Sequence, residues 1–266
     1  MNLREKKEKT IIGRRSEKDL FRSESKNVHS TAERPREEDR EAEMSLNIAI
    51  DGPVGAGKSS IADQVAAKLG ILHLDTGAMY RALGLLALRR GIDPEDEEKV
   101  VRLCEGMDLD VEIGEEGQRT ILEGEDVSAL IRTQEVSMAA SAVSKYARVR
   151  AWMVARQQAL AAKQDMILDG RDICMTVLPG ADVKVYLTAS AEERARRRWL
   201  ETREKGGKES FEEVLSAVKK RDDQDMNRKV EPLRQAPDAY LLDSTDLSMD
   251  QVVDRIVKMA EAKKRG

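Results

Sequence analysis

The sequence predicts an α/β protein in which helices flank a parallel sheet of five strands. Short apolar runs that are typical of buried strands occur at 46–50, 71–74, 166–168, 183–187 and 239–243. Stretches with the apolar period of a helix separate these runs, and that alternation favours a parallel sheet. The first run also leads directly into a glycine-rich turn and then a helix.

The composition limits the class of protein. The chain has 266 residues, of which 40% are hydrophobic and 36% are charged, with a formal net charge of -4. This balance gives no general bias toward nucleic acid or a membrane, so neither is expected as a partner. No apolar run is long enough to span a bilayer, and Cys104 and Cys174 lack a C-x-x-C spacing. We therefore expect a cytoplasmic protein, and since His29 and His73 stand at no metal-ligand spacing from the cysteines, no zinc site.

Residues 1–44 are dense in charges of both signs and poor in apolar residues, which predicts a disordered extension. They lack the apolar centre of a secretory signal, and their acidic residues argue against a mitochondrial presequence. The folded domain is expected to span 45–266, and Met44, just before the first strand, is expected to be the natural initiator.

The first strand precedes a loop that matches the pattern G-x-x-x-x-G-K-[ST]: Gly52, Pro53, Val54, Gly55, Ala56, Gly57, Lys58, Ser59 and Ser60. Its glycines allow successive N–H groups to turn toward one anion. Lys58 adds a charge able to reach the β- and γ-phosphates, and Ser59 adds a hydroxyl for Mg²⁺. Ile61 and Val65 then repeat at helical spacing, and the N-terminus of that helix favours an anion. The loop predicts a bound nucleoside triphosphate.

The second strand ends in a polar turn at 75–81, which contains Thr76 and Arg81. Ligands of open α/β sheets gather at the carboxyl ends of the strands, so a second ligand is expected here. Arg81 is a candidate to bind a phosphate of that ligand. The alternative is a solvated arginine at the start of the leucine-rich helix that follows.

Residues 107–130 predict a small antiparallel insert, since apolar and polar residues alternate on both sides of a turn signal at 114–117. Two helices are expected next, at 133–145 and 147–163.

The strand at 166–168 runs into Asp169, Gly170, Arg171 and Asp172, a cluster of charge at the carboxyl end of a buried strand. An aspartate there can hold Mg²⁺, and an arginine there can bind a phosphate through two hydrogen bonds. We assign Asp169, together with Ser59, to Mg²⁺. The alternative is a turn held by salt bridges.

Capping boxes at 190–193 and 210–213 predict two helices on either side of a break at 206–207. Both helices are rich in charge, and such runs are usually solvated faces. Phosphoryl transfer, however, needs positive charge at the transferring group and the exclusion of water, and a closing lid supplies both. We therefore predict a mobile helical lid at about 194–228.

From about Leu46 to the C-terminus the chain resembles bacterial cytidylate kinases, which phosphorylate CMP and dCMP with ATP. The shared segments are IDGPVGAGKSS, LDTGAMYR, LEGEDVSALIRTQEVSMAAS, ARVR, ILDGRD, ASAEERARRR, KKRDDQDMNR and LLDST. The resemblance implies the fold of P-loop nucleoside monophosphate kinases, with a monophosphate-binding insert at about 78–163 and the lid described above. It also implies Mg²⁺ as cofactor and a monomer.

Roles for single residues follow from the same resemblance. It implies that the acceptor phosphate is held by Thr76, Arg81, Arg171 and Arg228, that cytosine is read by Ser141, Arg150 and Asp172, that Arg221 and Asp225 lie at the ribose, and that Arg197 joins the lid arginines around the donor phosphates. The implied catalytic residues are Lys58, Arg171, Arg197 and Arg228.

The implied base-reading residues suit the chemistry of cytosine. The amino group of cytosine donates a hydrogen bond while its ring nitrogen and carbonyl accept, so a carboxylate with an arginine and a hydroxyl complements that edge. Uracil reverses the donor pattern, so a preference for CMP over UMP is expected. Because the acceptor phosphate is already an anion, we expect in-line transfer without a general base.

The chain departs from the family pattern at two places. Thr76 stands where serine is common, and it keeps the hydroxyl. After DGRD the family usually continues with Ile-Gly-Thr, whereas this chain has Ile173, Cys174 and Met175. We therefore expect the side chain of Cys174 near the base pocket, with an effect on pocket shape.

Two other functions are compatible with the nucleotide-binding loop. One is a P-loop kinase of another nucleoside monophosphate or of a small-molecule alcohol, and a panel of acceptors would identify it. The other is a nucleotide-sensing ATPase, which would release ADP without any acceptor. Neither alternative accounts for Ser141, Arg150 and Asp172 together.

Overall fold

The computed structural model describes residues 45–114, 117–204 and 206–264. The predicted extension at 1–44 therefore lies outside the described residues, as do residues 115–116 of the predicted turn.

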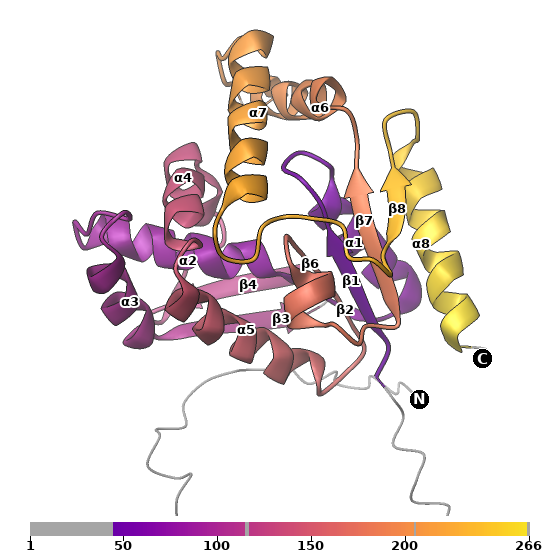
Figure 1. Ribbon diagram of the computed structural model, residues 1–266, viewed down its shortest axis with the longest axis horizontal. Coiled ribbons are helices and arrows are strands. Elements are labelled where there is room, and N and C mark those ends of the chain that lie inside the picture. The colour runs from indigo at the N-terminus through magenta and orange to yellow at the C-terminus, as the bar shows by residue number, and fades with distance from the viewer. Residues whose placement is uncertain (1–44, 115–116, 205, 265–266) are drawn as a thin grey trace, which may run out of the picture.

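Within the described chain, five parallel strands form the central sheet, in the order β2-β6-β1-β7-β8 (Figure 1). They are β1 (Asn47–Asp51), β2 (Leu72–Asp75), β6 (Met166–Gly170), β7 (Val183–Thr188) and β8 (Tyr240–Asp243). The predicted five-stranded parallel sheet is confirmed. The chain leaves β1 toward one edge and later crosses to the other, so ligands are expected at the carboxyl end of β1 and its neighbours.

Both faces of this sheet are buried beneath helices. The helices on one face are α1 (Lys58–Leu69) and α8 (Met249–Lys264), and those on the other include α2 (Thr76–Arg89) and α5 (Ala147–Ala161). Ile48 and Ile50 of β1 pack in the cluster that α1 and α8 complete, while Ala49 packs in the cluster with α2 and α5. Successive side chains of a strand point to opposite faces, so the three central residues of β1, Ile48, Ala49 and Ile50, are all apolar.

The predicted antiparallel insert is also confirmed. In the described residues it is a three-stranded sheet of β3 (Leu109–Gly114), β4 (Gly117–Leu122) and β5 (Glu125–Asp126). The helices predicted on its C-terminal side are α4 (Gln134–Val143) and α5, with the short 3₁₀ turn η3 (Leu130–Arg132) before them.

Helix α3 (Glu97–Glu105) was not predicted. The Asp96 side chain caps it by accepting a hydrogen bond from the Lys99 N–H at 3.2 Å. Val100, Val101 and Cys104 are its buried side. An N-cap aspartate followed by a short apolar stripe could have predicted this helix.

Helices α2 and α4 pack in backbone contact at Gly84. A Cβ atom at this position would lie 2.8 Å from the backbone nitrogen of Ala140 and 3.2 Å from the Cβ of Ala139. The glycine thus allows α4, which carries Ser141, to lie against α2.

The charged helices predicted as a lid are α6 (Ala191–Glu204) and α7 (Phe211–Asn227), which lie above the carboxyl ends of the strands (Figure 1). The capping box predicted at 210–213 is formed. Trp199 of α6 and Phe211 of α7 meet edge to face, with ring centroids 6.5 Å apart. The two helices therefore have a small apolar core between them.

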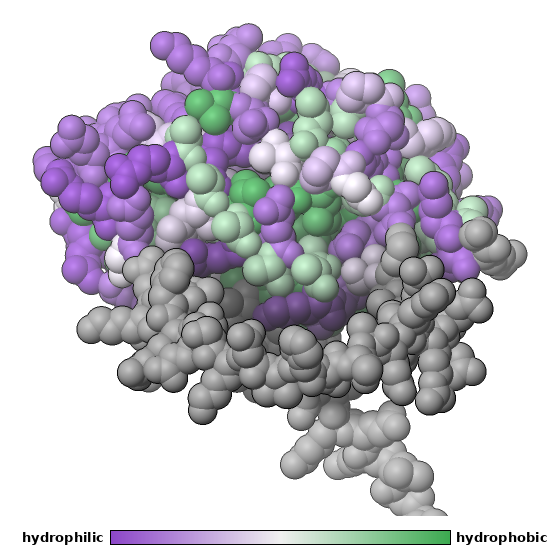
Figure 2. All heavy atoms as spheres, turned by 60° about the horizontal axis from the view of Figure 1, so that its bottom comes forward, coloured by the Kyte–Doolittle hydropathy of each residue, from purple (hydrophilic) through white to green (hydrophobic). Residues whose placement is uncertain are grey.

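On the face shown in Figure 2, hydrophilic side chains dominate the rim of the described surface and apolar side chains are grouped nearer its centre. Among the helices that the structure describes, none combines the length and the apolar character that crossing a membrane requires.

We expect Gly84→Ala to lower the free energy of unfolding by about 1–3 kcal/mol, because the added methyl group enters a contact with the backbone of α4. Chemical denaturation would measure this change. Gly106→Ala is the control, since a Cβ at this C-cap of α3 would meet nothing closer than 3.6 Å. Equal stability of the two variants would contradict the close approach of α2 and α4.

Candidate active site

The glycine-rich loop at 52–60 has the backbone that its sequence predicts. Gly52, Gly55 and Gly57 have positive φ angles of 154°, 75° and 86°. A Cβ at Gly52 would lie 1.9 Å from the Leu187 carbonyl oxygen of β7, so this first glycine permits the loop to leave β1 beside β7. No side chain caps the start of α1 at Gly57, which leaves the first N–H groups of the helix to a ligand.

Lys58 is the first residue of α1, and its ammonium is turned into the loop. Its Nζ donates a hydrogen bond to the Pro53 carbonyl oxygen at 2.9 Å. Burial lowers the pKa of Lys58 to about 7, and the nearby charge of Arg171 acts in the same direction. A phosphate bound in the loop would supply the negative charge that this buried amine lacks.

The two residues assigned to Mg²⁺ lie together. The Ser59 hydroxyl donates a hydrogen bond to Oδ2 of Asp169 at 3.1 Å, and Asp169 is buried. A hydroxyl and a carboxylate are the hard oxygen ligands that Mg²⁺ prefers. In the described ranges no group of three or more His, Cys, Asp and Glu side chains could hold a metal by itself. The pair therefore fits an ion that takes its other ligands from water and phosphate.

Sequence reasoning missed His73, which lies directly behind Asp169. Its Nε2 lies 2.8 Å from Oδ1 of Asp169, and its Nδ1 lies 2.6 Å from Oδ1 of Asp63. Burial by itself would lower the pKa of His73, but the hydrogen bonds with both carboxylates outweigh it and raise the pKa to about 10. His73 is thus a buried imidazolium that holds Asp169 from the side opposite Ser59.

The polar stretch at 75–81 forms the start of α2, and the prediction of a turn there is wrong. The Asp75 carboxylate caps the helix by accepting a hydrogen bond from the Ala78 N–H at 3.1 Å, and it also forms an ion pair with Arg81. The Thr76 hydroxyl donates to the Asp169 carbonyl oxygen at 2.8 Å. Thr76 and Arg81 therefore lie at the carboxyl end of β2, next to the end of β6.

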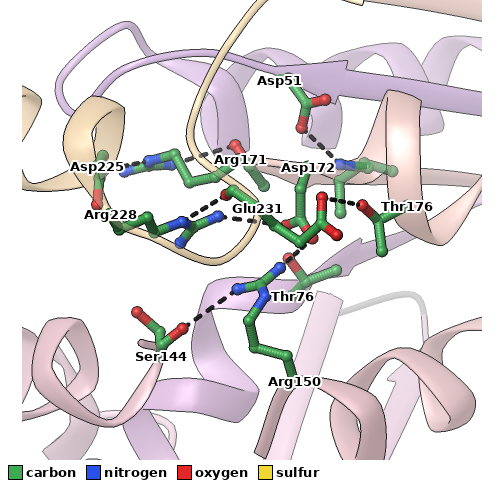
Figure 3. A network of polar contacts seen from close by, with 12 residues as sticks. Asp51, Thr76, Ser144, Arg150, Arg171, Asp172, Thr176, Asp225, Arg228 and Glu231 are labelled. Atoms are coloured by element: carbon green, nitrogen blue, oxygen red, sulfur yellow. Dashed lines mark hydrogen bonds and ion pairs between the residues drawn. The ribbon is translucent and has the colours of Figure 1, made fainter. Parts of the chain in front are cut away.

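Two of the three residues assigned to cytosine form a buried ion pair, between Arg150 of α5 and Asp172 (Figure 3). Nη2 of Arg228 lies 3.9 Å from the other carboxylate oxygen of Asp172. Ser141 is buried in α4 and is connected to Arg150 through Ser144, whose carbonyl accepts from Arg150 and whose hydroxyl donates to the Ser141 carbonyl.

Asp225 of α7 joins the lid helix to the end of β6. Its carboxylate accepts hydrogen bonds from Nε of Arg171 at 2.8 Å and from Nε of Arg221 at 3.1 Å. Burial would raise the pKa of Asp225, but the two arginines outweigh it and hold the pKa below its usual range. Arg221 also donates to the Ser137 carbonyl of α4 at 3.0 Å, so α7 contacts α4.

Buried arginine nitrogens without a hydrogen-bond partner point to a ligand site. In the described part of the chain they are Nε of Arg81, Nε of Arg150 and Nη2 of Arg228. Buried donors are rarely left unpaired, and unpaired ones commonly mark a functional site. All three belong to residues that were assigned to the acceptor, so the cluster is suited to an anionic ligand.

The arginine of α6 that contacts the glycine-rich loop is Arg194. Its Nη1 donates to the Val54 carbonyl oxygen at 2.9 Å, and its guanidinium forms two hydrogen bonds with the Asp222 carboxylate of α7. Arg197, which was assigned to the donor phosphates, donates instead to Glu193 and to Ser244 after β8. Sequence reasoning listed both arginines in one run and could not tell which of them faces the loop.

The predicted place of the Cys174 side chain is wrong. Its Sγ lies 3.6 Å from the Ala49 carbonyl oxygen and 3.8 Å from the Val185 carbonyl oxygen, so it points into the sheet beneath the site. The reason is the π-helical turn η4 (Ile173–Val177), which directs this side chain away from Asp172. The cysteine therefore fills the core and leaves the space around Asp172 unchanged.

Comparisons with known proteins assign this geometry to a family. The family model for cytidylate kinase matches residues 48–262. A cytidylate kinase of Caldicellulosiruptor bescii is 48% identical over 214 residues, which are 80% of this chain and 95% of the relative. Those of Shouchella clausii and Bacillus subtilis are 48% and 44% identical, and the matches cover 83% and 84% of this chain and 98% and 100% of the relatives.

We expect Arg194→Met to lower the free energy of unfolding by about 3 kcal/mol, because the change leaves Asp222 without its buried partner and Val54 without a donor. The matched control is Arg196→Met, two residues further along the same helix, whose guanidinium is exposed and pairs with Glu193. Urea denaturation of both variants measures this change. Equal losses of unfolding free energy in the two variants would contradict a larger contribution of the buried Arg194 ion pair to stability.

Proposed function

The chain belongs to the cytidylate kinase family, and we propose that the residues at the carboxyl ends of β1, β2 and β6 carry out the reaction of that family. The enzyme transfers the γ-phosphoryl group of ATP to CMP or dCMP, giving ADP and CDP or dCDP. The observation that supports our assignment of residues is the buried arginine nitrogens without a hydrogen-bond partner, on side chains that meet Asp75 at the end of β2 and Asp172 after β6.

The donor half of the site is the loop at 52–60. Its backbone N–H groups and the start of α1 bind the phosphates of ATP, and Lys58 leaves the Pro53 carbonyl to reach the β- and γ-phosphates. Ser59 and Asp169 would hold Mg²⁺, which neutralises charge on the phosphates when it is bound. His73 keeps Asp169 in place for this task.

The acceptor half is the arginine cluster. Arg81, Arg171 and Arg228 bind the phosphate of CMP, and the Thr76 hydroxyl lies beside them at the end of β2. These arginines form ion pairs with Asp75, Asp225 and Asp172, and a phosphate that binds them competes with these carboxylates. Because the phosphate is already an anion, the transfer needs positioning and positive charge and no general base.

Asp172 and Arg150 read the base. Asp172 accepts a hydrogen bond from the amino group of cytosine, and Arg150 donates to its ring nitrogen or carbonyl, while Ser141 supports Arg150 through Ser144. Uracil carries a carbonyl in place of the amino group, which would face the Asp172 carboxylate. A site built for a donor disfavours such an analogue strongly.

Three further assignments complete the proposal. Arg221 and Asp225 hold the ribose, at the contact between α7 and α4. Arg197, which donates to Ser244 in the structure, is assigned to the donor phosphates by the family resemblance alone. The protein acts as a cytoplasmic monomer on free nucleotides, in keeping with its two buried, free cysteine thiols.

A coupled assay of ADP release tests the reaction. With ATP and Mg²⁺, we expect rapid turnover with CMP and dCMP, and only background with UMP, AMP, GMP or no acceptor, because the Asp172 carboxylate selects an amino group at that edge. ADP release that did not depend on the acceptor would instead identify an ATPase.

Arg171→Ala should lower kcat by about 100-fold or more, since the enzyme loses a positive charge that stabilises the phosphoryl group during transfer. Its effect on thermal stability should be small, because Asp225 keeps its ion pair with Arg221. Steady-state kinetics and a thermal melt test both statements. Arg90→Ala, at the exposed C-cap of α2, is the control, and an Arg171→Ala enzyme as active as this control would remove Arg171 from the site.

A further inference from the structure

Asp51, the last residue of β1, has a buried side chain to which neither the loop pattern nor the family resemblance gave a role. Only 1% of the residue is exposed. Its two carboxylate oxygens accept hydrogen bonds from two consecutive backbone N–H groups, Oδ1 from Ile173 at 2.8 Å and Oδ2 from Cys174 at 2.9 Å. Figure 3 shows the carboxyl group directed at this backbone rather than at the arginines.

The N–H groups of Ile173 and Cys174 need a hydrogen-bond acceptor from outside the turn η4. They lie at the start of η4, and the first N–H groups of a helical turn have no partner within it. The side chain of Asp172, the residue before the turn, makes no capping bond to them. Asp51 therefore acts as their cap from a strand that is more than 120 residues away in sequence.

This cap fixes the residue that contacts the base. Asp172 has φ -147° and ψ 23° and belongs neither to β6 nor to η4, so no regular element fixes its backbone. On one side it follows β6, which is paired with β1 at Gly170 and Asp51. On the other side Asp51 holds the next two peptides. The direction of the Asp172 side chain toward Arg150 depends on both anchors.

The anchor itself is rigid. Asp51 lies between β6 and β7 in the sheet, in register with Gly170 and Tyr186. The next residue, Gly52, passes β7 so closely that a Cβ at this position would lie 1.9 Å from the Leu187 carbonyl oxygen. One carboxylate thus ties the base-reading segment to the strand from which the phosphate loop begins.

Burying the charged carboxylate of Asp51 costs electrostatic free energy. Burial raises the pKa of Asp51 to about 6, although the hydrogen bonds from Cys174 and Ile173 act in the opposite direction. At neutral pH the group is therefore a buried carboxylate held mainly by peptide N–H groups, and costly groups of this kind concentrate where function needs exact placement.

We propose that Asp51 is a positioning residue for base selection: it holds the peptides after Asp172 so that the Asp172 carboxylate meets the amino group of cytosine. This inference rests on the base-reading role proposed for Asp172. Asp51 contacts neither substrate, so its substitution should change which base is accepted much more than how ATP is bound.

The test is a competition between CMP and UMP in one reaction with Asp51→Asn, whose amide can accept only one of the two N–H groups. We expect the ratio of CDP to UDP formed to fall about tenfold, with the KM for ATP changed by less than about twofold. A ratio equal to that of the wild type would overturn the proposal. Because both acceptors compete for the same enzyme molecules, the ratio does not depend on the fraction that is folded.

Asp182→Asn is the matched control. Oδ2 of Asp182 accepts a hydrogen bond from the Asn47 N–H at 2.8 Å, at the opposite end of β1. This variant also loses an aspartate that holds backbone, but far along the strand from Asp172, and its ratio should equal that of the wild type. An equal fall in both variants would mean that base selection responds to any loosening of β1, and would also overturn the proposal.

Asp172→Asn separates this inference from the function on which it rests. If the ratio collapses in Asp172→Asn and stays unchanged in Asp51→Asn, Asp172 reads the base and Asp51 does not position it. If neither variant changes the ratio, the base-reading assignment itself fails. Asp51→Ser, with a single acceptor oxygen and no charge, is measured in parallel and should show the same fall as Asp51→Asn.

Discussion

The pairing of β1 with β6 on one side and β7 on the other determines where the other parts of the site can lie. Through this register the ends of the strands stop at one level, with Asp51 beside Gly170 and Tyr186. Gly52 then passes Leu187 at a distance that allows no side chain. The glycine-rich loop leaves the end of β1, and Asp169 and Arg171, which we propose for Mg²⁺ and the acceptor phosphate, lie at the end of β6. A shift of β1 by one residue would exchange its buried faces and separate the donor half of the site from the acceptor half.

Electrostatic pairing within the site follows from this crowding. Several arginines and aspartates are buried within a few ångströms of one another, and each cation needs a counter-charge as long as no nucleotide is present. Arg150 is paired with Asp172, and Asp225 is shared by Arg171 and Arg221. Lys58 donates only to a carbonyl, and its burial, together with the nearby charge of Arg171, lowers its pKa to about 7. The acceptor half is therefore balanced internally, whereas the donor half depends on its ligand for charge.

The parts of this structure that could be predicted are those whose determinants are close together in sequence. The glycine loop, the strands and the capping box at 210–213 are of this kind, and helix α3 would have been found from Asp96 and its apolar stripe. Contacts between distant segments could not be predicted. His73 meets Asp169 across 96 positions, and Arg194 meets Val54 across 140. Likewise, the Cys174 side chain points into the core within a π-helical turn that has no simple sequence signal.

The shared carboxylate of Asp225 has a thermodynamic consequence. Asp225 belongs to α7 and accepts hydrogen bonds from Arg171, which follows β6, and from Arg221 of its own helix. Arg221 in turn donates to the Ser137 carbonyl of α4. A ligand that withdraws Arg171 from Asp225 removes one of the contacts that attach α7 to the core. By linkage, a movement of α7 that breaks this contact changes the affinity for that ligand by the same free energy. In the function proposed here that ligand is the acceptor phosphate, so its binding and the position of α7 are coupled through a single side chain.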